Sequence, residues 1–144
     1  MKLLHKDADY AVRTLIFLAL HTEETYFSAA KLAKELGLPT TFTRRICTVL
    51  IKNGILETRE GIKGGVRLLV KPETVSLYDL MTLFRDSIDM TECTFRKKLC
   101  PNQKNCVLRK RMLVIHEKMI DEFKEITIQT LMDDIHNQSI VDIS

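Results

Sequence analysis

The sequence predicts a mainly α-helical protein with one small β-hairpin, arranged as a winged helix-turn-helix domain followed by a long C-terminal dimerisation helix. Apolar residues recur at helical spacing through most of the chain, and two strand-like runs, 55–59 and 66–70, flank a glycine-rich turn. With 144 residues, of which 45% are hydrophobic, the chain is long enough for one ordinary domain with a core.

The first half begins with three expected helices. Residues 9–21 predict a strongly apolar helix, and Ser28 can cap a second helix over 29–36 that Gly37 ends. After a turn at 38–40, a third helix is expected from about 41 to 53. Two helices joined by a short glycine-containing turn form a helix-turn-helix. The expected buried face of the third helix consists of Phe42, Ile46, Val49 and Leu50.

The polar side chains at the start of the third helix are suited to DNA. A recognition helix meets base edges with its N-terminal part, and Thr and Arg donate hydrogen bonds to phosphates and bases. Any surface helix can begin with threonines, so the hairpin that follows is the stronger indication. The expected DNA-contacting residues of the helix-turn-helix are Ser28, Thr40, Thr41, Thr43, Arg44 and Arg45.

The hairpin has a basic, glycine-rich tip over residues 60–65. Such a wing can place Arg59, Lys63 and Arg67 along phosphates or in a minor groove, while Gly64 and Gly65 keep bulk away from the sugar-phosphate backbone. A nucleotide-binding phosphate loop is excluded, because the Gly-Lys-Ser/Thr ending is missing.

The charge distribution favours a polyanionic partner. The net charge is only +3, yet residues 40–71 carry seven basic side chains against two acids. Residues 96–111 carry seven basic side chains and no acid, and residues 117–144 reverse the sign with seven acids against two lysines. Solvated faces would explain the charge alone, but not its combination with the predicted wing.

Three cysteines lie within fourteen residues, at 93, 100 and 106, with the spacing C-x6-C-x5-C. Four basic residues and no acid separate the first from the last, and basic neighbours favour thiolates and offset the charge of a thiolate-ligated cluster. This region predicts a metal or iron–sulfur site at Cys93, Cys100 and Cys106. Cys47, inside the third helix, is expected to be a core residue, and His116 an ordinary helix residue.

The second half predicts a short helix over 77–84, capped by Ser76, and a long helix from about Val107. Apolar side chains recur along the long helix at steps of 3 and 4, which suits packing on another helix. Covering its own domain is the alternative, but a helix this long has little local surface to cover. The expected dimer interface consists of Leu108, Met112, Ile115, Met119, Phe123 and Ile126.

The sequence resembles the IscR and NsrR group of bacterial winged-helix transcription regulators, the Rrf-two family. The resemblance lies in the segments 9–13, 28–33, 50–56 and 59–68 and in the position of the three cysteines, and it extends to about residue 130. It implies a homodimer that binds a palindromic double-stranded DNA operator. It also implies a repressor whose operator affinity depends on an iron–sulfur cluster that senses redox state, iron, cluster supply or nitric oxide.

A cluster needs a fourth ligand. Some family members use a histidine three residues after the last cysteine, where this chain has Arg109. Others use an acid before the aromatic-Ala pair of the first helix, supplied by the partner subunit, and Asp9 occupies that position. Asp7 and Glu92 are less favoured substitutes, and the alternative for Asp9 is that it is only a helix N-terminal acid. A 4Fe–4S cluster is favoured over 2Fe–2S, and it is expected to tie the cysteine loop of one subunit to the first helix of the other.

Two other binding classes remain open. Structural zinc accepts three thiolates and an Asp, although the usual close Cys-x-x-Cys pair is missing. A thiol switch would join Cys100 and Cys106 as a disulfide. No motif of an enzyme is present, and catalysis is not expected.

The expected organisation is a DNA-binding domain at 1–75, a short helix and cysteine loop at 76–106, a dimerisation helix at 107–135 and a flexible tail at 136–144. Because the start lacks the apolar core of a signal peptide and no run is long enough to span a membrane, we expect a cytoplasmic protein with no membrane partner.

Overall fold

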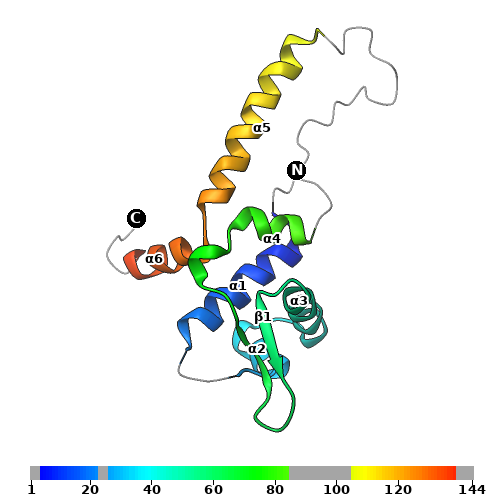
Figure 1. Ribbon diagram of the computed structural model, residues 1–144, viewed down its shortest axis with the longest axis vertical. Helices are drawn as coiled ribbons and strands as arrows, with labels where there is room; N and C mark the ends of the chain where they lie inside the picture. Colours follow the sequence, from blue (N-terminus) through cyan, green and yellow to red (C-terminus); the bar gives the residue numbers. More distant parts are fainter. Residues whose placement is uncertain (1–3, 23–25, 85–104, 139–144) are drawn as a thin grey trace.

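The computed structural model describes residues 4–22, 26–84 and 105–138. Over these residues the chain is mainly helical with one two-stranded hairpin, as predicted (Figure 1). The elements are α1 (Lys6–Leu20), α2 (Ala29–Leu36), α3 (Thr40–Lys52), β1 (Leu56–Arg59), β2 (Gly65–Leu68), the 3-10 turn η1 (Pro72–Thr74), α4 (Leu77–Leu83), α5 (Val107–Glu125) and α6 (Ile128–Gln138).

The core forms where α1, α2 and α3 meet. Leu15 of α1, Leu32 of α2, and Ile46 and Leu50 of α3 are each fully buried, and the three helices contact one another pairwise. Burying a Leu or Ile side chain stabilises a fold by roughly 1.5–3 kcal/mol. This apolar contact fixes the angle at which α3 presents its opposite face to solvent.

Local signals set the ends of these helices. The Ser28 side chain accepts a hydrogen bond from the backbone N–H of Lys31 at 3.1 Å, and Gly37 ends α2 with φ of 63°. Both predicted boundaries of α2 are thus confirmed. The first helix begins at Lys6, earlier than predicted, with Asp7 and Asp9 in its first turn, where a helix dipole favours acids.

The wing is an antiparallel hairpin in which Leu56 pairs with Leu68 and Arg59 with Gly65. An additional bridge joins it to the chain before α2: Phe27 N–H donates to Val66 O at 2.9 Å, and Val66 N–H donates to Phe27 O at 2.8 Å. The hairpin is therefore fixed to the start of the helix-turn-helix and does not depend on its own two strands alone.

The C-terminal region differs from the single helix predicted over 107–135. The first part, α5, ends at Glu125, and Ile126 has extended backbone with ψ of 103°. A separate helix, α6, then continues to Gln138, so part of the predicted flexible tail is helical. The single-helix prediction is wrong at this point, and Ile126 is not part of the helix on which it was placed.

Long-range hydrogen bonds explain the break. Leu77 N–H donates to Ile126 O at 2.7 Å, and Ile128 N–H donates to Val75 O at 3.0 Å. These bonds form a bridge between Ser76 and Thr127, which lie far apart in sequence. Ile128 is buried in the core, and α6 packs against α1 and η1. The last helix therefore belongs to the N-terminal domain.

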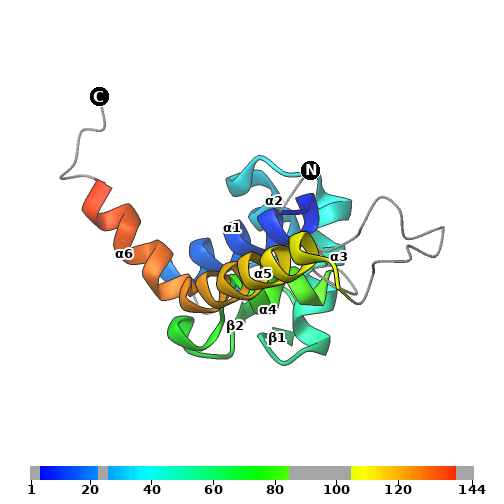
Figure 2. The same ribbon diagram turned by 90° about the horizontal axis from the view of Figure 1, so that it is seen from above.

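Only part of α5 lies against this domain. It contacts α4, and none of its residues is buried. In Figure 1 it rises away from α1–α4, and Figure 2 shows the same helix from above, with α6 extending to one side. A long helix with so little cover leaves an apolar surface available to a second chain.

Candidate nucleic-acid interface and cysteine site

The exposed side of α3 carries the side chains that the sequence assigned to DNA. Thr40, Thr41, Arg44 and Arg45 are all exposed, and the helix sequence contains no acid. Pro39 precedes the first turn and gives no side-chain cap, so free N–H groups of this turn add positive potential. Arg44 forms no ion pair with any acid in the described part of the chain. This face can donate hydrogen bonds to phosphates and base edges.

Thr43 is a correction to the predicted set. Its side chain is 1% exposed, and its hydroxyl donates to Pro39 O at 3.1 Å. The buried face of α3 consists of Thr43, Ile46, Cys47 and Leu50, while Phe42 and Val49 are only half-buried. The predicted face was rotated, because apolarity alone placed Phe42 inward, whereas Thr43 satisfies its hydroxyl within its own helix and can be buried.

Arg45 has partners within the protein. Its Nη2 lies 2.5 Å from Oδ1 of Asp7, in the first turn of α1. Its guanidinium carbon lies 4.8 Å from the centre of the Phe42 ring, which also packs edge-on against Tyr10 at 6.2 Å. The N-terminal turn of α1 therefore lies beside the exposed face of α3.

Two of the three basic side chains of the wing lie against one aromatic ring. The guanidinium carbons of Arg59 and Arg67 lie 5.8 and 5.1 Å from the centre of the Tyr26 ring. Arg67 Nε also pairs with Glu57, whose carboxylate accepts a hydrogen bond from the Tyr26 hydroxyl at 3.3 Å. Arg67 is partly neutralised, whereas Arg59 makes no ion pair within the described residues.

The structure explains why glycine occupies two positions in the wing. A Cβ on Gly64 would lie 2.1 Å from Arg59 O, and a Cβ on Gly65 would lie 2.2 Å from Phe27 O. Gly65 also has φ of 147°, a conformation that favours glycine. Both positions exclude side chains because the protein's own backbone approaches them. Lys63, at the tip, is exposed beside the fully exposed Ile62.

Ser28 lies where the wing meets the start of α2. Its hydroxyl oxygen caps α2, and the side chain remains exposed beside the bridge that holds the wing. A hydroxyl that accepts from Lys31 can still donate its own hydrogen. The predicted DNA residues of α2, α3 and the wing thus belong to one connected unit, apart from the buried Thr43.

Of the predicted cluster ligands, Cys106 and Asp9 lie in the described residues, and Cys93 and Cys100 lie outside them. Cys106 is the N-cap of α5, and its Sγ accepts a hydrogen bond from Arg109 N–H at 3.4 Å. Free N–H groups at a helix start suit an anionic sulfur ligand, so this position fits the predicted group. Asp9 is ion-paired with Arg13 at 3.1 Å. The described residues on their own bring no three His, Cys, Asp or Glu side chains together as a metal site.

Cys47 is a core residue, as predicted. It is 3% exposed, and burial raises the pKa of its thiol to about 11. The thiol therefore stays protonated at neutral pH and is unsuited to nucleophilic or metal chemistry.

Five of the six predicted dimer residues lie on α5. Leu108 and Ile115 are 70% and 53% exposed, and Met112, Met119 and Phe123 are half-buried. The stripe is therefore open along much of its length within a single chain.

Comparison with known proteins identifies the family. The Rrf2 family model, described as an iron-dependent transcriptional regulator, matches residues 4–134. This chain belongs to the Rrf2 family. Its curated relatives include the transcriptional regulator NsrR of Shouchella clausii, which is 26% identical over 131 residues that cover 90% of this chain and 86% of the relative.

Solved structures of Rrf2-type regulators share the fold. T. potens IscR aligns with a TM-score of 0.69 at 19% identity, over 94% of this chain and 88% of that one. CymR of B. subtilis, a global cysteine regulator, aligns with a TM-score of 0.75 at 18% identity, over 92% and 98% of the two chains. The mainly helical winged-helix class and the absence of an enzyme among these relatives agree with the prediction. This Rrf2 protein is a DNA-binding transcription regulator, and none of its described helices could cross a membrane.

The sequence did not single out several residues that shape the predicted DNA-contacting surface. Ile62 is fully exposed at the wing tip, Tyr26 supports two wing arginines, and Glu57 pairs with one of them. Alternation along the strands could have located Glu57 opposite Arg67, since cross-strand neighbours of opposite charge pair. Tyr26 gave no signal, because it lies outside every regular element.

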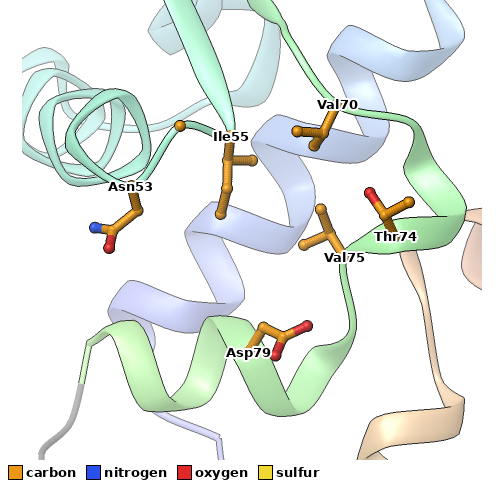
Figure 3. Close-up of a pocket in the computed structure, with 7 residues that line it drawn as sticks. Asn53, Ile55, Val70, Thr74, Val75 and Asp79 are labelled. Atoms are coloured by element: carbon orange, nitrogen blue, oxygen red, sulfur yellow. The ribbon is translucent and has the colours of Figure 1, made fainter.

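A cavity of about 180 Å³ lies behind the interface, between the end of α3, η1 and α4 (Figure 3). Ile55, Val70 and Val75 form apolar walls. The Asp79 carboxylate at its edge accepts hydrogen bonds from the N–H and hydroxyl of Ser76, as part of the α4 capping box. Its polar capacity is thus largely used within the fold, and the cavity offers little to orient a ligand.

Proposed function

We propose that this Rrf2 regulator represses transcription by binding a palindromic operator as a homodimer, with an affinity set by an iron–sulfur cluster. The observation that carries the DNA part is the exposed surface of α3 and the wing, which are connected because α3 contacts β1 and the Phe27–Val66 bridge joins the wing to the chain before α2. One rigid unit can place a helix in the major groove and a hairpin along the adjacent backbone.

The roles on DNA follow from the contacts within the protein. Arg44 is exposed and makes no ion pair with the described acids, so it is the first candidate for a bidentate contact with guanine. Thr41 and the free N–H groups of the first turn are suited to phosphate. At the wing tip, Lys63 reaches phosphates, and Ile62 is an apolar side chain of the kind that enters minor grooves.

The binding test begins with operator selection from a random duplex library, since the operator is unidentified. Replacement of Arg44 by alanine should weaken binding to the selected duplex by about 1–3 kcal/mol and relax the preference at one base pair. Lys124→Ala removes one positive charge from the last turn of α5, outside α3 and the wing, and is the control; the Lys124 ammonium lies 5.2 Å from the centre of the Tyr78 ring of α4. Equal effects of the two substitutions would refute the placement of α3.

The homodimer rests on the exposed apolar stripe of α5. Leu108 and Ile115 would otherwise leave large apolar surfaces in water. A two-fold axis along α5 would place two copies of α3 on successive half-sites of a palindrome. Ile115→Glu should give a monomer by light scattering, and Val114→Glu should not, because Val114 is similarly exposed at 48% but lies off the stripe.

For the cluster, Cys93, Cys100, Cys106 and Asp9 are the proposed ligands, with 4Fe–4S favoured over 2Fe–2S. When bound, such a cluster supplies a centre that reacts with oxidants and nitric oxide. Cys106 fixes one ligand to the start of α5, and Asp9 lies in the turn of α1 that contacts α3. A cluster that binds both residues would therefore influence the position of α3, the proposed recognition helix.

The test is to measure iron, acid-labile sulfide and zinc in protein purified without oxygen. We expect about four iron and four sulfide per monomer for a cubane, and about two of each for 2Fe–2S. Cys100→Ala should lose both, whereas Cys47→Ala, a buried cysteine outside the ligand set, should keep them. Iron retained in Cys100→Ala would overturn the ligand assignment.

A second candidate uses the same cysteines without a cluster. Cys106 is a free, half-buried thiol, so a disulfide with Cys100 or a zinc site are the two chemistries available. Zinc near one per monomer would favour the structural metal. Reversal of DNA binding by a dithiol reductant in metal-free protein would favour the switch.

A further inference from the structure

The recognition helix is not uniformly cationic, because an acid from another helix lies against it. Asp7 Oδ1 lies 2.5 Å from Arg45 Nη2, although α3 itself contains no acid. The two side chains are 31% and 55% exposed, so both lie at the protein surface and remain open to a ligand. Asp7 therefore brings a negative charge to the surface proposed to meet DNA.

The pair is held in place by aromatic contacts. The Arg45 guanidinium stacks on Phe42 at 4.8 Å, and the Phe42 ring packs against Tyr10 of α1. Lys6 Nζ lies 5.6 Å from the centres of both rings. These contacts orient Arg45 toward α1, so the ion pair is a defined arrangement of two packed helices.

We propose that Asp7 limits the DNA affinity of this protein by neutralising Arg45. A lysine or arginine contributes to binding by releasing counterions from phosphates, and this contribution requires an uncompensated positive charge. An arginine that is already paired with a carboxylate releases fewer counterions from the phosphates, and the carboxylate itself repels phosphates. This inference rests on the proposed placement of α3 in the major groove.

The same turn of α1 also carries Asp9, two residues further along. Asp7 pairs with Arg45 of α3, whereas Asp9 pairs with Arg13 of its own helix. One acid therefore pairs with α3, and the other, which pairs with Arg13 of its own helix, is the proposed fourth ligand of the sensor site. A movement of this turn alters the Asp7–Arg45 contact directly, since the two acids lie two residues apart in the first turn of the same helix.

The test is Asp7→Asn in the full chain, which keeps the shape of the side chain and removes its charge. The probe is a fluorescein-labelled duplex of about 30 base pairs, followed by anisotropy from about 0.1 M to about 1 M salt. One additional phosphate contact in each subunit steepens the salt dependence by about 1.8 for the proposed dimer, which is about 60-fold in affinity over this range. We expect Asp7→Asn to bind more tightly by this factor at low salt and to converge with the parent near 1 M.

Two further variants test whether the effect of Asp7→Asn arises from its pairing with Arg45. In an Arg45→Ala background, Asp7→Asn should lose most of its effect, because the neutralised partner is gone. Glu73→Gln removes an equal charge from η1, which packs on α6, and should leave the salt dependence unchanged. Unchanged or weaker binding of Asp7→Asn, with a native melting temperature, would overturn the proposal.

Arg44→Ala separates this inference from the proposal on which it rests. If Arg44→Ala binds as tightly as the parent, the placement of α3 fails. If Arg44→Ala weakens binding while Asp7→Asn has no effect, α3 contacts DNA and only the role of Asp7 is refuted.

Discussion

Replacement of Gly65 by alanine tests how the wing is joined to the helix-turn-helix. In the structure a Cβ at this position would lie 2.2 Å from Phe27 O and 2.7 Å from Ser28 N, both backbone atoms. Flexible side chains could move aside, but backbone atoms within a β-bridge cannot do so without breaking it. The backbone at Gly65, with φ of 147°, is also unfavourable for alanine.

The expected loss of stability in Gly65→Ala follows from the hydrogen bonds that the substitution breaks and from the backbone strain that it adds. Separation of Phe27 from Val66 removes two backbone hydrogen bonds, of 2.9 and 2.8 Å, each contributing about 1 kcal/mol. The positive φ adds about 1 kcal/mol. The total is about 3 kcal/mol, which for a chain of this size lowers the melting temperature by about 6–12 °C.

Gly61→Ala is the matched control in the same hairpin. Gly61 also has a positive φ, of 106°, but no atom lies within 4 Å of an added Cβ. It should therefore show only the backbone effect, about 1 kcal/mol, or about 2–4 °C. The assay is thermal unfolding followed by circular dichroism. If the melting temperatures of Gly65→Ala and Gly61→Ala lie within about 2 °C of one another, the close approach of the Phe27 backbone does not explain the glycine at position 65.

Further predictions concern the core, the buried thiol and the wing. Leu50→Ala removes a fully buried side chain and should destabilise the protein by about 2–5 kcal/mol in urea unfolding, whereas the exposed Thr48→Ala should change stability far less. For Cys47, burial raises the folded-state pKa from 9.0 to about 11. The stabilising contribution of the thiol is therefore complete below pH 9 and is lost as the pH rises through about 11. Cys47→Ala should flatten this decline in the free energy of unfolding, measured in urea from pH 8 to about 10.5, and an identical decline in both proteins would contradict the assignment. Glu57→Gln should release Arg67 and strengthen DNA binding at low salt, which anisotropy titration would show, and unchanged binding would indicate that Arg67 faces away from DNA.

Local sequence signals predicted much of the fold. Ser28 and Gly37 bound α2 because capping and left-handed termination depend on the residues at the helix ends themselves. The glycine-rich turn between two strand-like runs predicted the wing, and the structure contains this hairpin. Ser76 began α4 as expected, with Asp79 completing a capping box.

The errors arose where distant residues decided the outcome. The apolar spacing of α5 continues past residue 126, so periodicity alone could not reveal the break. A local signal was nevertheless present, because Thr127 and Thr130 exchange hydrogen bonds of 2.8 and 3.1 Å at the start of α6. Burial of Ile128 and the bridge to Ser76 then hold the last helix against α1.

The candidate site divides in the same way. The sequence by itself determined the predicted recognition helix, the basic wing and the three-cysteine motif, because residue type and spacing carry that information. Only the tertiary structure decided which of these residues are available: Thr43 is buried, Arg67 pairs with Glu57, and Arg45 pairs with Asp7. The physical reason is that the effective charge of a side chain depends on its neighbours in space, and packing brings together residues such as Asp7 and Arg45 that lie 38 positions apart.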